Sequence, residues 1–491
     1  MTTPQSFLVN GKARQGDGHT LESVDPADGS IAGVVYRATA GDVDDAVRGA
    51  AAAVAQPEWR DMPAHKRARM LHQFADLIHR DRDALVELQT RDNGKTIKEG
   101  YQHVQGAVEK FRYCAAVCET LESQVLPPRG NYFVYKTYEP MGVVAAMTAF
   151  NSPILHEAGK IAPAVAAGNA VVLKSSDITP LIGLQYGLLA LEAGLPPGII
   201  NVVPGGADVG AALVNHPAIN MIAFTGGTKT GRVIGHAAAE RIIPCILELG
   251  GKSPNIVFED ANLDHAVAGM IYGIFSNAGQ SCIAGSRIMV QASIYDTFVE
   301  RLVAATKALK VGPPRDPLTA VAPVASFRQR DAIEAYIAIG KRDAAVRLLC
   351  GGERPRGEEF DRGAYVTPTL FETTDPRCAI AQEEIFGPVG VVMKFEGEED
   401  LVRMANDTVF GLSLGVWTEN YHKAMRTVRA IKAGTVWVNT HKIGQPSVPM
   451  GGFKESGIGR ENGIDGILEY LQIKSTYWNL AETPIAWPPK N

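Results

Sequence analysis

Apolar and polar positions follow two different periods along this chain. Over residues 43–54 and 66–89, apolar side chains recur every three or four positions, which is the period of an amphipathic helix. Pro57 and Pro63 separate these two stretches, and after Pro140 short apolar runs alternate with helical ones. The pattern predicts a largely helical opening section followed by an α/β region.

The first alternating series begins just after Pro140 and predicts one sheet. Its expected strands are residues 143–147, 170–173, 199–203 and 221–224, and its expected helices are residues 154–167, 179–194 and 210–216. Strands that alternate with helices pair in parallel, because each helix crosses over between two strands. We therefore expect a parallel sheet with helical crossovers.

A second alternating series predicts a second α/β unit. Its expected strands are residues 255–258, 287–290, 364–370, 389–395, 414–417 and 435–438. Two further segments, residues 132–138 and 473–478, alternate polar with aromatic or β-branched side chains, which is a strand pattern. We expect these two segments to pair as an edge sheet between subunits.

Size, composition and charge narrow the class of protein. A chain of 491 residues exceeds what one hydrophobic core usually supports, and 46% hydrophobic with 21% charged residues is ordinary globular composition. The net charge of −5, without a basic stripe, argues against a nucleic-acid partner and favours small-molecule chemistry. Pro163 and Gly168 interrupt the longest apolar stretch and the amino terminus lacks a signal-peptide pattern, so we expect a cytoplasmic protein without a membrane span.

Six cysteines are few for this length. None forms a paired CxxC arrangement, so the sequence suggests neither a disulfide framework nor a metal site. Cys282 differs from the others because it lies among small residues, within the stretch 277–287, that would leave room for a substrate. A thiol in such a turn serves as a nucleophile once it is deprotonated, although a buried structural thiol is the more common reading of a lone cysteine.

The second candidate catalytic group is the carboxylate of Glu248, which lies just before the paired glycines 250 and 251. It ends an apolar run, where burial would raise the pKa of its carboxyl group and make it a base. The alternative is a glutamate that holds the following turn through backbone N–H groups.

Taken with five further blocks, these two segments resemble the aldehyde dehydrogenase superfamily over nearly the whole chain, in its hydrolytic NAD(P)-dependent branch. The blocks are Ala149 to Pro153, Leu173 to Asp177, Phe224 to Gly231, Glu383 to Pro388 and Pro449 to Gly457. Each block alone is a weak signal, whereas all of them in the family's order form a specific one.

The resemblance implies an α/β fold with three parts. A Rossmann-like cofactor-binding domain would comprise residues 1–122 and 141–249, and an α/β catalytic domain would comprise residues 250–449. Residues 123–140 and 450–491 would form a small β element for oligomerisation and bridging. A homodimer or homotetramer is the implied assembly.

The resemblance also implies the roles of three catalytic residues. Cys282 would attack the aldehyde carbon, and the Asn151 amide with the backbone N–H of Cys282 would stabilise the oxyanion. Glu248 would then activate the water that hydrolyses the thioester. Without the family, Asn151 before a serine and a proline is an Asx turn or a helix cap.

The cofactor implied by the resemblance is NAD, with NADP as an alternative. The implied cofactor-binding residues are Thr148, Phe150, Lys174, Asp177, Gly210, Phe224, Thr225, Gly226, Gly227, Thr228, Gly231, Leu249, Glu384 and Phe386. Glycine-rich backbone at a helix start would approach the pyrophosphate, Lys174 with Asp177 would bind the adenosine ribose, and Glu384 with Phe386 would hold the nicotinamide ribose and ring. Taken singly, the glycine-rich segment is also compatible with an ordinary turn, and the segment with Lys174 and Asp177 with a solvated charged loop. The segment with Glu384 and Phe386 is compatible with a turn that starts a strand.

Several positions depart from the family's commonest pattern. Phe150 replaces a tryptophan, and Asp177 replaces a longer glutamate; its carboxylate still favours NAD, because it would repel a 2′-phosphate. Where many relatives carry bulky aromatic residues in the substrate funnel, the corresponding stretches here contain Ser152, His156, Gly159, Ile443, Gly444 and Met450. This predicts a wide, somewhat polar pocket for a bulky or cyclic aldehyde, in which His156 either bonds the substrate or is simply half-buried.

Competing functions receive less support from the residues. Glu248 argues against the branch that transfers its acyl group to coenzyme A, which typically lacks this glutamate. A phosphorylating or semialdehyde-specific enzyme would require anion-binding arginines near the pocket, and the matching blocks contain no clear cluster of them. A binding protein that has lost catalysis is disfavoured by the intact Cys282, Glu248 and Asn151.

Overall fold

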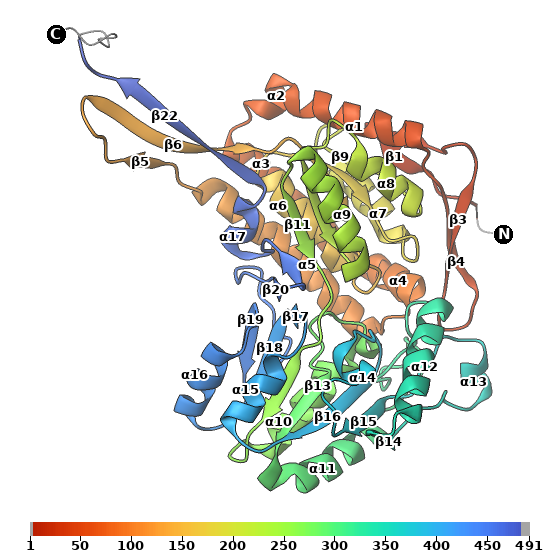
Figure 1. Ribbon diagram of the computed structural model, residues 1–491. Coiled ribbons are helices and arrows are strands. Elements are labelled where there is room, and N and C mark those ends of the chain that lie inside the picture. The colour runs from red at the N-terminus through yellow and green to blue at the C-terminus, as the bar shows by residue number, and fades with distance from the viewer. Residues whose placement is uncertain (1–2, 483–491) are drawn as a thin grey trace.

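A computed structural model describes residues 3–482 and arranges them as two α/β lobes with a projecting antiparallel ribbon (Figure 1). The first lobe contains a six-stranded sheet and the second a seven-stranded sheet. Each lobe has its own hydrophobic core, one drawn mainly from residues 7–249 and the other from residues 256–433. Within the described residues, no helix combines the length and apolar character needed to cross a membrane.

The amino-terminal region begins with two strand pairs that the hydrophobic pattern did not predict. The strands are β1 (Phe7–Val9), β2 (Lys12–Arg14), β3 (Thr20–Val24) and β4 (Ile31–Tyr36). Asn10 and Gly11 join β1 to β2, and both have positive φ angles, 53° and 73°, as a two-residue hairpin turn requires. This Asn-Gly pair was a readable hairpin signal. Because β1 is buried at every position, it lacks the alternation by which half-buried strands are recognised.

Helices fill the rest of the opening section. They are α1 (Ala40–Ala55), α2 (Pro57–Arg60), α3 (Ala64–Arg80), α4 (Arg82–Asn93) and α5 (Ile97–Thr120). The single helix predicted over residues 66–89 is therefore wrong, since the chain breaks at Asp81 between α3 and α4. Asp81 leaves helical geometry, with φ of −92° and ψ of 14°, while the apolar period continues in the buried Leu85 and Val86 of α4, so the hydrophobic pattern does not mark the break.

The six-stranded sheet of the first lobe confirms the first alternating series. Its spatial order is β21 (Gly457–Ile458), β11 (Cys245–Glu248), β10 (Met221–Thr225), β7 (Val143–Met147), β8 (Ala170–Lys174) and β9 (Ile200–Val202). All neighbouring pairs are parallel except β21 with β11. The crossover helices are α6 (Pro153–Ala166), α7 (Leu181–Glu192), α8 (Ala207–Asn215) and α9 (Thr228–Arg241), of which α8 begins three residues before the predicted start at residue 210.

The seven-stranded sheet confirms most of the second series. Its order is β14 (Val346–Cys350), β15 (Thr369–Thr373), β16 (Val389–Phe395), β13 (Arg287–Gln291), β12 (Pro254–Val257), β18 (Ser413–Trp417) and β19 (Thr435–Val438). The prediction for residues 364–370 is wrong in its first part, because β15 starts only at Thr369. Residues 364–366 are buried in a connection that bonds other loops, and Pro368 has no N–H to donate to a strand ladder.

Helices cover both faces of this second sheet. They are α10 (Leu263–Phe275), η1 (Ser276–Gly279), η2 (Ala292–Ile294), α11 (Tyr295–Lys307), α12 (Phe327–Arg342), α13 (Glu358–Asp361), α14 (Ala379–Gln382), α15 (Glu398–Asn406) and α16 (Tyr421–Ala430). Two short strands, β17 (Phe410–Gly411) and β20 (Phe453–Lys454), pair with each other close to β21.

The projecting ribbon consists of β5 (Gln124–Leu126), β6 (Tyr132–Pro140) and β22 (Leu471–Asn479), and α17 (Gly463–Leu468) leads into it. The predicted pairing of residues 132–138 with 473–478 is confirmed, since β6 and β22 are antiparallel over their whole length. In Figure 1 the ribbon extends away from both lobes. It carries large apolar side chains on its surface: Val125, Tyr132, Phe133, Ile473, Tyr477 and Trp478.

Arg287 anchors the start of β13 inside the second lobe. Its side chain is fully buried, and its guanidinium donates to the carbonyl oxygens of Lys252 at 2.8 Å, Met404 at 3.1 Å and Ala405 at 2.8 Å. Burial lowers the pKa of Arg287 to about 10, which leaves it charged at neutral pH. One cation thereby joins β13, the loop before β12 and the end of α15.

Replacing this cation should destabilise the fold. In Arg287→Met three carbonyls lose their donor, and we expect the free energy of unfolding to fall by about 3 kcal/mol. Urea unfolding followed by tryptophan fluorescence measures the change. The exposed Arg69→Met is the matched control and should shift stability by less than about 0.5 kcal/mol. Equal unfolding midpoints for both variants would contradict the anchoring role.

Candidate active site

The predicted site residues gather along the carboxyl edge of the six-stranded sheet. From β7 the chain proceeds to β8 and β9 on one side, then returns to β10 and β11 on the other, so the strand order reverses between β7 and β10. Loops at such a reversal diverge and leave a crevice in which α/β proteins bind ligands. Asn151 follows β7, Lys174 ends β8, Thr225 ends β10 and Glu248 ends β11.

Cys282 lies on a connection from the second lobe whose backbone is unusual. Asn277, Ala278 and Gly279 all have positive φ angles, 57°, 51° and 73°. At Gly279 a side chain would overlap the carbonyl group of Gly387, so glycine is required there on two grounds. Left-handed backbone at two non-glycine residues is strained, and such strain concentrates at functional sites.

Hydrogen bonds from the first lobe hold this connection in place. The Asn151 amide Nδ2 donates to the Gln280 carbonyl oxygen at 3.0 Å, and the Asn277 amide Nδ2 donates to the Asn151 carbonyl oxygen at 3.0 Å. The Gln280 side chain accepts from the Ala325 backbone N–H at 2.9 Å. Cys282 is therefore positioned by both lobes, only two residues from a fixed carbonyl group.

The surroundings of Cys282 favour the protonated thiol. Burial raises the pKa of its thiol to about 12, and the nearby carboxylates of Glu384, Glu248 and Glu461 add to the rise. The Lys442 ammonium acts in the opposite direction. Without an additional positive charge nearby, most of the thiol is protonated at neutral pH.

Asn151 and His156 form a polar pair beside the thiol. The His156 Nε2 atom lies 3.0 Å from the Asn151 Oδ1 atom. Burial lowers the pKa of His156 to about 4, so the ring is neutral at pH 7 and its Nε2–H donates to the amide oxygen. The amide is thereby oriented with its NH₂ group toward Gln280, and one of its two N–H bonds is used there.

Glu248 is buried at the end of β11, within the same group of residues. Burial raises the pKa of its carboxyl group well above the usual range, the Glu461 carboxylate adds to this, and Lys160 opposes it. Its Oε1 atom is buried without a hydrogen-bond partner among residues 3–482. Glu461 itself forms a buried ion pair with Lys160, which outweighs the effect of burial and lowers the pKa of Glu461.

Two cavities meet at these residues. The sheet-edge cavity, of about 210 Å³, is lined by Glu248, Gly226 and Glu384 among others, and the funnel cavity, of about 470 Å³, by residues such as Ser152 and Ile443. Three residues line both cavities: Asn151, His156 and Cys282. The thiol is thus open to one ligand from each side.

Half of the predicted cofactor residues line the sheet-edge cavity. They are Phe150, Thr225, Gly226, Gly227, Leu249, Glu384 and Phe386. The Phe150 and Phe386 rings meet edge to face with centroids 5.6 Å apart, and Phe386 has a left-handed backbone with φ of 56°. Burial raises the pKa of Glu384 to about 7, while its Oε1 accepts the Gly251 backbone N–H at 3.0 Å.

The other predicted cofactor residues lie near this cavity without lining it: Thr148, Lys174, Asp177, Gly210, Phe224, Thr228 and Gly231. Thr228 accepts the Gly250 backbone N–H at 3.3 Å, Phe224 packs on Gly226, and Gly231 packs against Leu249. Lys174, Gly210 and the exposed Asp177 follow the carboxyl edge outward from there, where a Cβ on Gly210 would lie 3.6 Å from the Lys174 side chain. The Thr148 backbone N–H donates to the Lys174 carbonyl oxygen at 3.3 Å.

Comparison with known proteins identifies this arrangement. The aldehyde dehydrogenase family model matches residues 13–476. The chain belongs to the aldehyde dehydrogenase family. The predicted superfamily, fold class and enzyme class are therefore confirmed.

Solved aldehyde dehydrogenases share the whole fold with this family member. It is 38% identical to an aldehyde dehydrogenase from Bacillus cereus solved as an NAD+ complex, with 98% of this chain and 97% of that one covered and a TM-score of 0.95. It is 35% identical to a betaine aldehyde dehydrogenase from Staphylococcus aureus in complex with NAD+, with coverages of 99% and 97% and a TM-score of 0.96.

Sequence patterns missed several residues of this aldehyde dehydrogenase's site. Gln329 on α12 lines the sheet-edge cavity and donates to the Phe386 carbonyl oxygen at 2.9 Å. Lys95, Lys110 and Lys442 line the funnel cavity. Gln329, Lys95 and Lys110 lie outside the motif blocks, whereas Lys442 directly precedes Ile443, which was expected in the funnel. No local pattern marks any of these side chains, so only the folded structure brings them to the site.

The electrostatics of Cys282 predict the pH dependence of its reactivity in the cofactor-free protein. Because the thiolate reacts and its pKa is raised to about 12, alkylation by iodoacetamide should speed up about tenfold per pH unit from pH 8 to 10. Mass spectrometry of the peptide containing Cys282 measures this rate, with Cys282→Ala as the control for peptide assignment. A rate that reaches a plateau by pH 8 would contradict the raised pKa.

Proposed function

We propose that this aldehyde dehydrogenase oxidises an aldehyde to a carboxylic acid with NAD, through a thioester on Cys282 that is hydrolysed by water. The observation that carries the proposal is the position of Cys282 and Asn151 where the two cavities meet, with Glu248 lining the sheet-edge cavity. A cofactor on one side and an aldehyde on the other would both reach the same thiol.

In the first step, Cys282 in its deprotonated thiolate form attacks the carbonyl carbon of an aldehyde held in the funnel cavity. The second N–H bond of the Asn151 amide and the backbone N–H of Cys282 are assigned to the developing oxyanion. His156 is a positioning residue in this scheme, since it fixes which way the Asn151 amide points. Oriented donors of this kind need no rearrangement when the charge develops, which is why they stabilise the transition state.

The sheet edge fits a dinucleotide. The 14-residue helix α9 starts directly after β10, and its N-cap Gly227 makes no side-chain cap hydrogen bond within residues 3–482, so backbone N–H groups are available to a pyrophosphate. Lys174 and Asp177 are assigned to the adenosine ribose, Glu384 to the nicotinamide ribose, and Phe386 to the ring. NAD, when bound, accepts the hydride from the carbon attached to sulfur.

The choice of NAD over NADP rests on two observations. Asp177 is exposed at the sheet edge, where its carboxylate would repel a 2′-phosphate. In addition, the Bacillus cereus and Staphylococcus aureus relatives were solved with NAD+.

Hydrolysis of the thioester is assigned to Glu248. Its raised pKa makes the carboxylate a stronger base than an exposed glutamate, and its unpartnered Oε1 is available to accept a proton from water. This assignment favours acid release over transfer to coenzyme A.

A bulky or cyclic aldehyde remains the proposed substrate class. The funnel cavity of about 470 Å³ supports it, with Ser152, Gly444 and Met450 along its wall. Part of the space expected at Gly159 is filled, because a Cβ there would lie 3.1 Å from the Lys110 ammonium. The funnel is therefore more polar than side-chain sizes alone suggested.

A homodimer or homotetramer is the proposed assembly, with the ribbon as a contact. Exposed Phe133 and Trp478 support it, since surfaces of this kind usually bind a partner. The roles assigned to the three predicted domains and the cytoplasmic location stay predictions from the sequence.

The reaction scheme predicts different defects for two variants. Cys282→Ala should abolish formation of NADH, because no thiohemiacetal can form. Glu248→Gln should release about one equivalent of NADH in a rapid burst and then slow by roughly a thousandfold, because acylation proceeds and hydrolysis does not. Stopped-flow absorbance with benzaldehyde and NAD measures both phases.

Controls separate these effects from general damage. Cys118→Ala, on α5 and outside both cavities, should keep wild-type turnover. Steady turnover in Cys282→Ala would refute the thioester. Repeating the assay with NADP and with hexanal tests cofactor and substrate: a higher kcat/KM for hexanal than for benzaldehyde would argue against a bulky substrate.

His156 offers a test of amide positioning. His156→Leu removes the donor to Asn151 Oδ1, and we expect kcat to fall about tenfold with little change in KM. His156→Gln, whose amide can also donate, should recover most of this loss. If both variants kept wild-type kcat, the histidine would have no part in orienting Asn151.

A further inference from the structure

Two lysines, the buried Lys95 and the half-buried Lys442, line the funnel cavity together with Cys282. Lys95 immediately precedes α5 and is 2% exposed, and Lys442 follows β19 on the opposite lobe. Lys442 has a left-handed backbone, with φ of 57°, a strained conformation for a residue with a side chain. The two lysines are 347 residues apart in the chain, so only folding brings them to the same cavity.

Neither lysine has a carboxylate partner in the described part of the chain. Lys442 Nζ donates to the Ser276 hydroxyl at 3.0 Å, whereas the side chain of Lys95 makes no hydrogen bond or ion pair within residues 3–482. Burial lowers the pKa of Lys442 to about 7 and that of Lys95 to about 8. A buried ammonium without an anion is unfavourable, and folded proteins rarely keep one without a function.

The carboxylates that face the funnel are already engaged. Glu99 raises the pKa of both lysines, but its oxygens accept the Asn277 backbone N–H at 2.6 Å and the Thr96 hydroxyl at 2.8 Å. Glu461 is paired with Lys160, and Lys110 interacts with the same carboxylate. Glu109 is exposed and accepts from Gln105 at 2.7 Å. Within residues 3–482, the ammonium groups of Lys95 and Lys442 thus form no ion pair with these carboxylates and remain available to a ligand.

We propose that Lys442, assisted by Lys95, binds a carboxylate on the substrate, so that the preferred substrates are aldehydes that also carry an acid group. This inference rests on the proposed function, because it assigns the second functional group of the aldehyde that Cys282 attacks. Lys442 and Cys282 line the same funnel cavity, so we assign the acid and the aldehyde groups to one small molecule. Arginines were expected for such a semialdehyde, and lysines from distant segments supply the charge instead.

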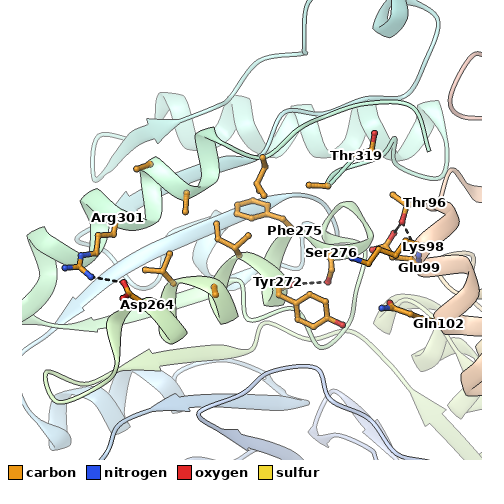
Figure 2. Close-up of a pocket in the computed structure, with 17 residues that line it drawn as sticks. Thr96, Lys98, Glu99, Gln102, Asp264, Tyr272, Phe275, Ser276, Arg301 and Thr319 are labelled. Atoms are coloured by element: carbon orange, nitrogen blue, oxygen red, sulfur yellow. Dashed lines mark hydrogen bonds and ion pairs between the residues drawn. The ribbon is translucent and has the colours of Figure 1, made fainter. Parts of the chain in front are cut away.

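A neighbouring lysine provides a matched control. Lys98 is exposed on the first turn of α5 and does not line the funnel. It lines a neighbouring groove of about 810 Å³ between α10 and α11, which shares Glu99, Gln102, Tyr272 and Ser276 with the funnel. Figure 2 shows Lys98 beside Glu99 and Gln102 at one end of that groove, with the Arg301–Asp264 ion pair at the other. Lys98 carries the same charge close to the funnel without lining it.

The experiment compares anionic aldehydes with neutral esters of the same shape. The two pairs are 4-oxobutanoate with methyl 4-oxobutanoate, and 4-carboxybenzaldehyde with methyl 4-formylbenzoate. In the wild-type enzyme with NAD, we expect kcat/KM for the better acid to exceed that of its ester by tenfold or more, the range for a charge-assisted hydrogen bond. Lys442→Gln should lose about ten- to a hundredfold for the acid, mostly in KM, and stay within about threefold for the ester.

Two further variants test whether the effect is specific to the lysines that line the funnel. Lys95→Gln should show a smaller loss restricted to the acid, and Lys98→Gln should show none. Equal kcat/KM for acid and ester in the wild-type enzyme would overturn the proposal. So would an equal loss for both substrates in Lys442→Gln, which would mean that Lys442 acts on the thiol. A preference for glyceraldehyde 3-phosphate over both acids would overturn the choice of a carboxylate.

Binding without turnover separates this inference from the proposed reaction. Succinate should raise the thermal unfolding midpoint of the wild-type protein, whereas dimethyl succinate should not, and Lys442→Gln should lose the effect. If no aldehyde is oxidised but succinate still binds through Lys442, the proposed function fails and the anion site stands. If Lys442→Gln does not fold, two measurements still test the proposal. They are the ratio of kcat/KM between acid and ester in the wild-type enzyme, and the loss of activity on the acid in Lys95→Gln.

Discussion

The hydrogen bonds that join the two lobes at Asn151 are the constraint on which this site depends. Asn151 belongs to the first lobe, and it both donates to Gln280 and accepts from Asn277, which belong to the second. Cys282 follows Gln280 by two residues, so its sulfur cannot move independently of the carboxyl edge of the first sheet. The first lobe and the connection that carries Cys282 are thereby joined, and the thiol lies where the sheet-edge cavity and the funnel cavity meet.

Burial then determines the charges within this frame. It raises the pKa of Cys282 and Glu248 and lowers those of His156, Lys95 and Lys442, so every group is shifted toward its neutral form. A ligand of opposite charge would favour the ionised form of each of these five groups, because a low dielectric strengthens each pairing. The electrostatics thus link chemistry at the thiol to occupation of both cavities.

Periodicity located the regular elements well where one period dominates. β7, β16 and β19 have the predicted bounds, and the parallel order of the first sheet follows from strands alternating with helices. Periodicity failed where the buried positions do not repeat with the period of the element that forms. β1 is buried throughout, residues 364–366 are apolar without being a strand, and the apolar period of residues 66–89 continues across the break at Asp81 into the buried Leu85 and Val86.

The sequence by itself determined the family, since its motif blocks stand in the order that aldehyde dehydrogenases share. It also determined the two α/β lobes, because local hydrophobic period specifies strands and helices. Only the tertiary structure decided which ionisable groups share a cavity. Lys95 and Lys442 lie at opposite ends of the sequence, and their shared surroundings depend on long-range packing, burial and the absence of a nearby partner, none of which a local pattern encodes.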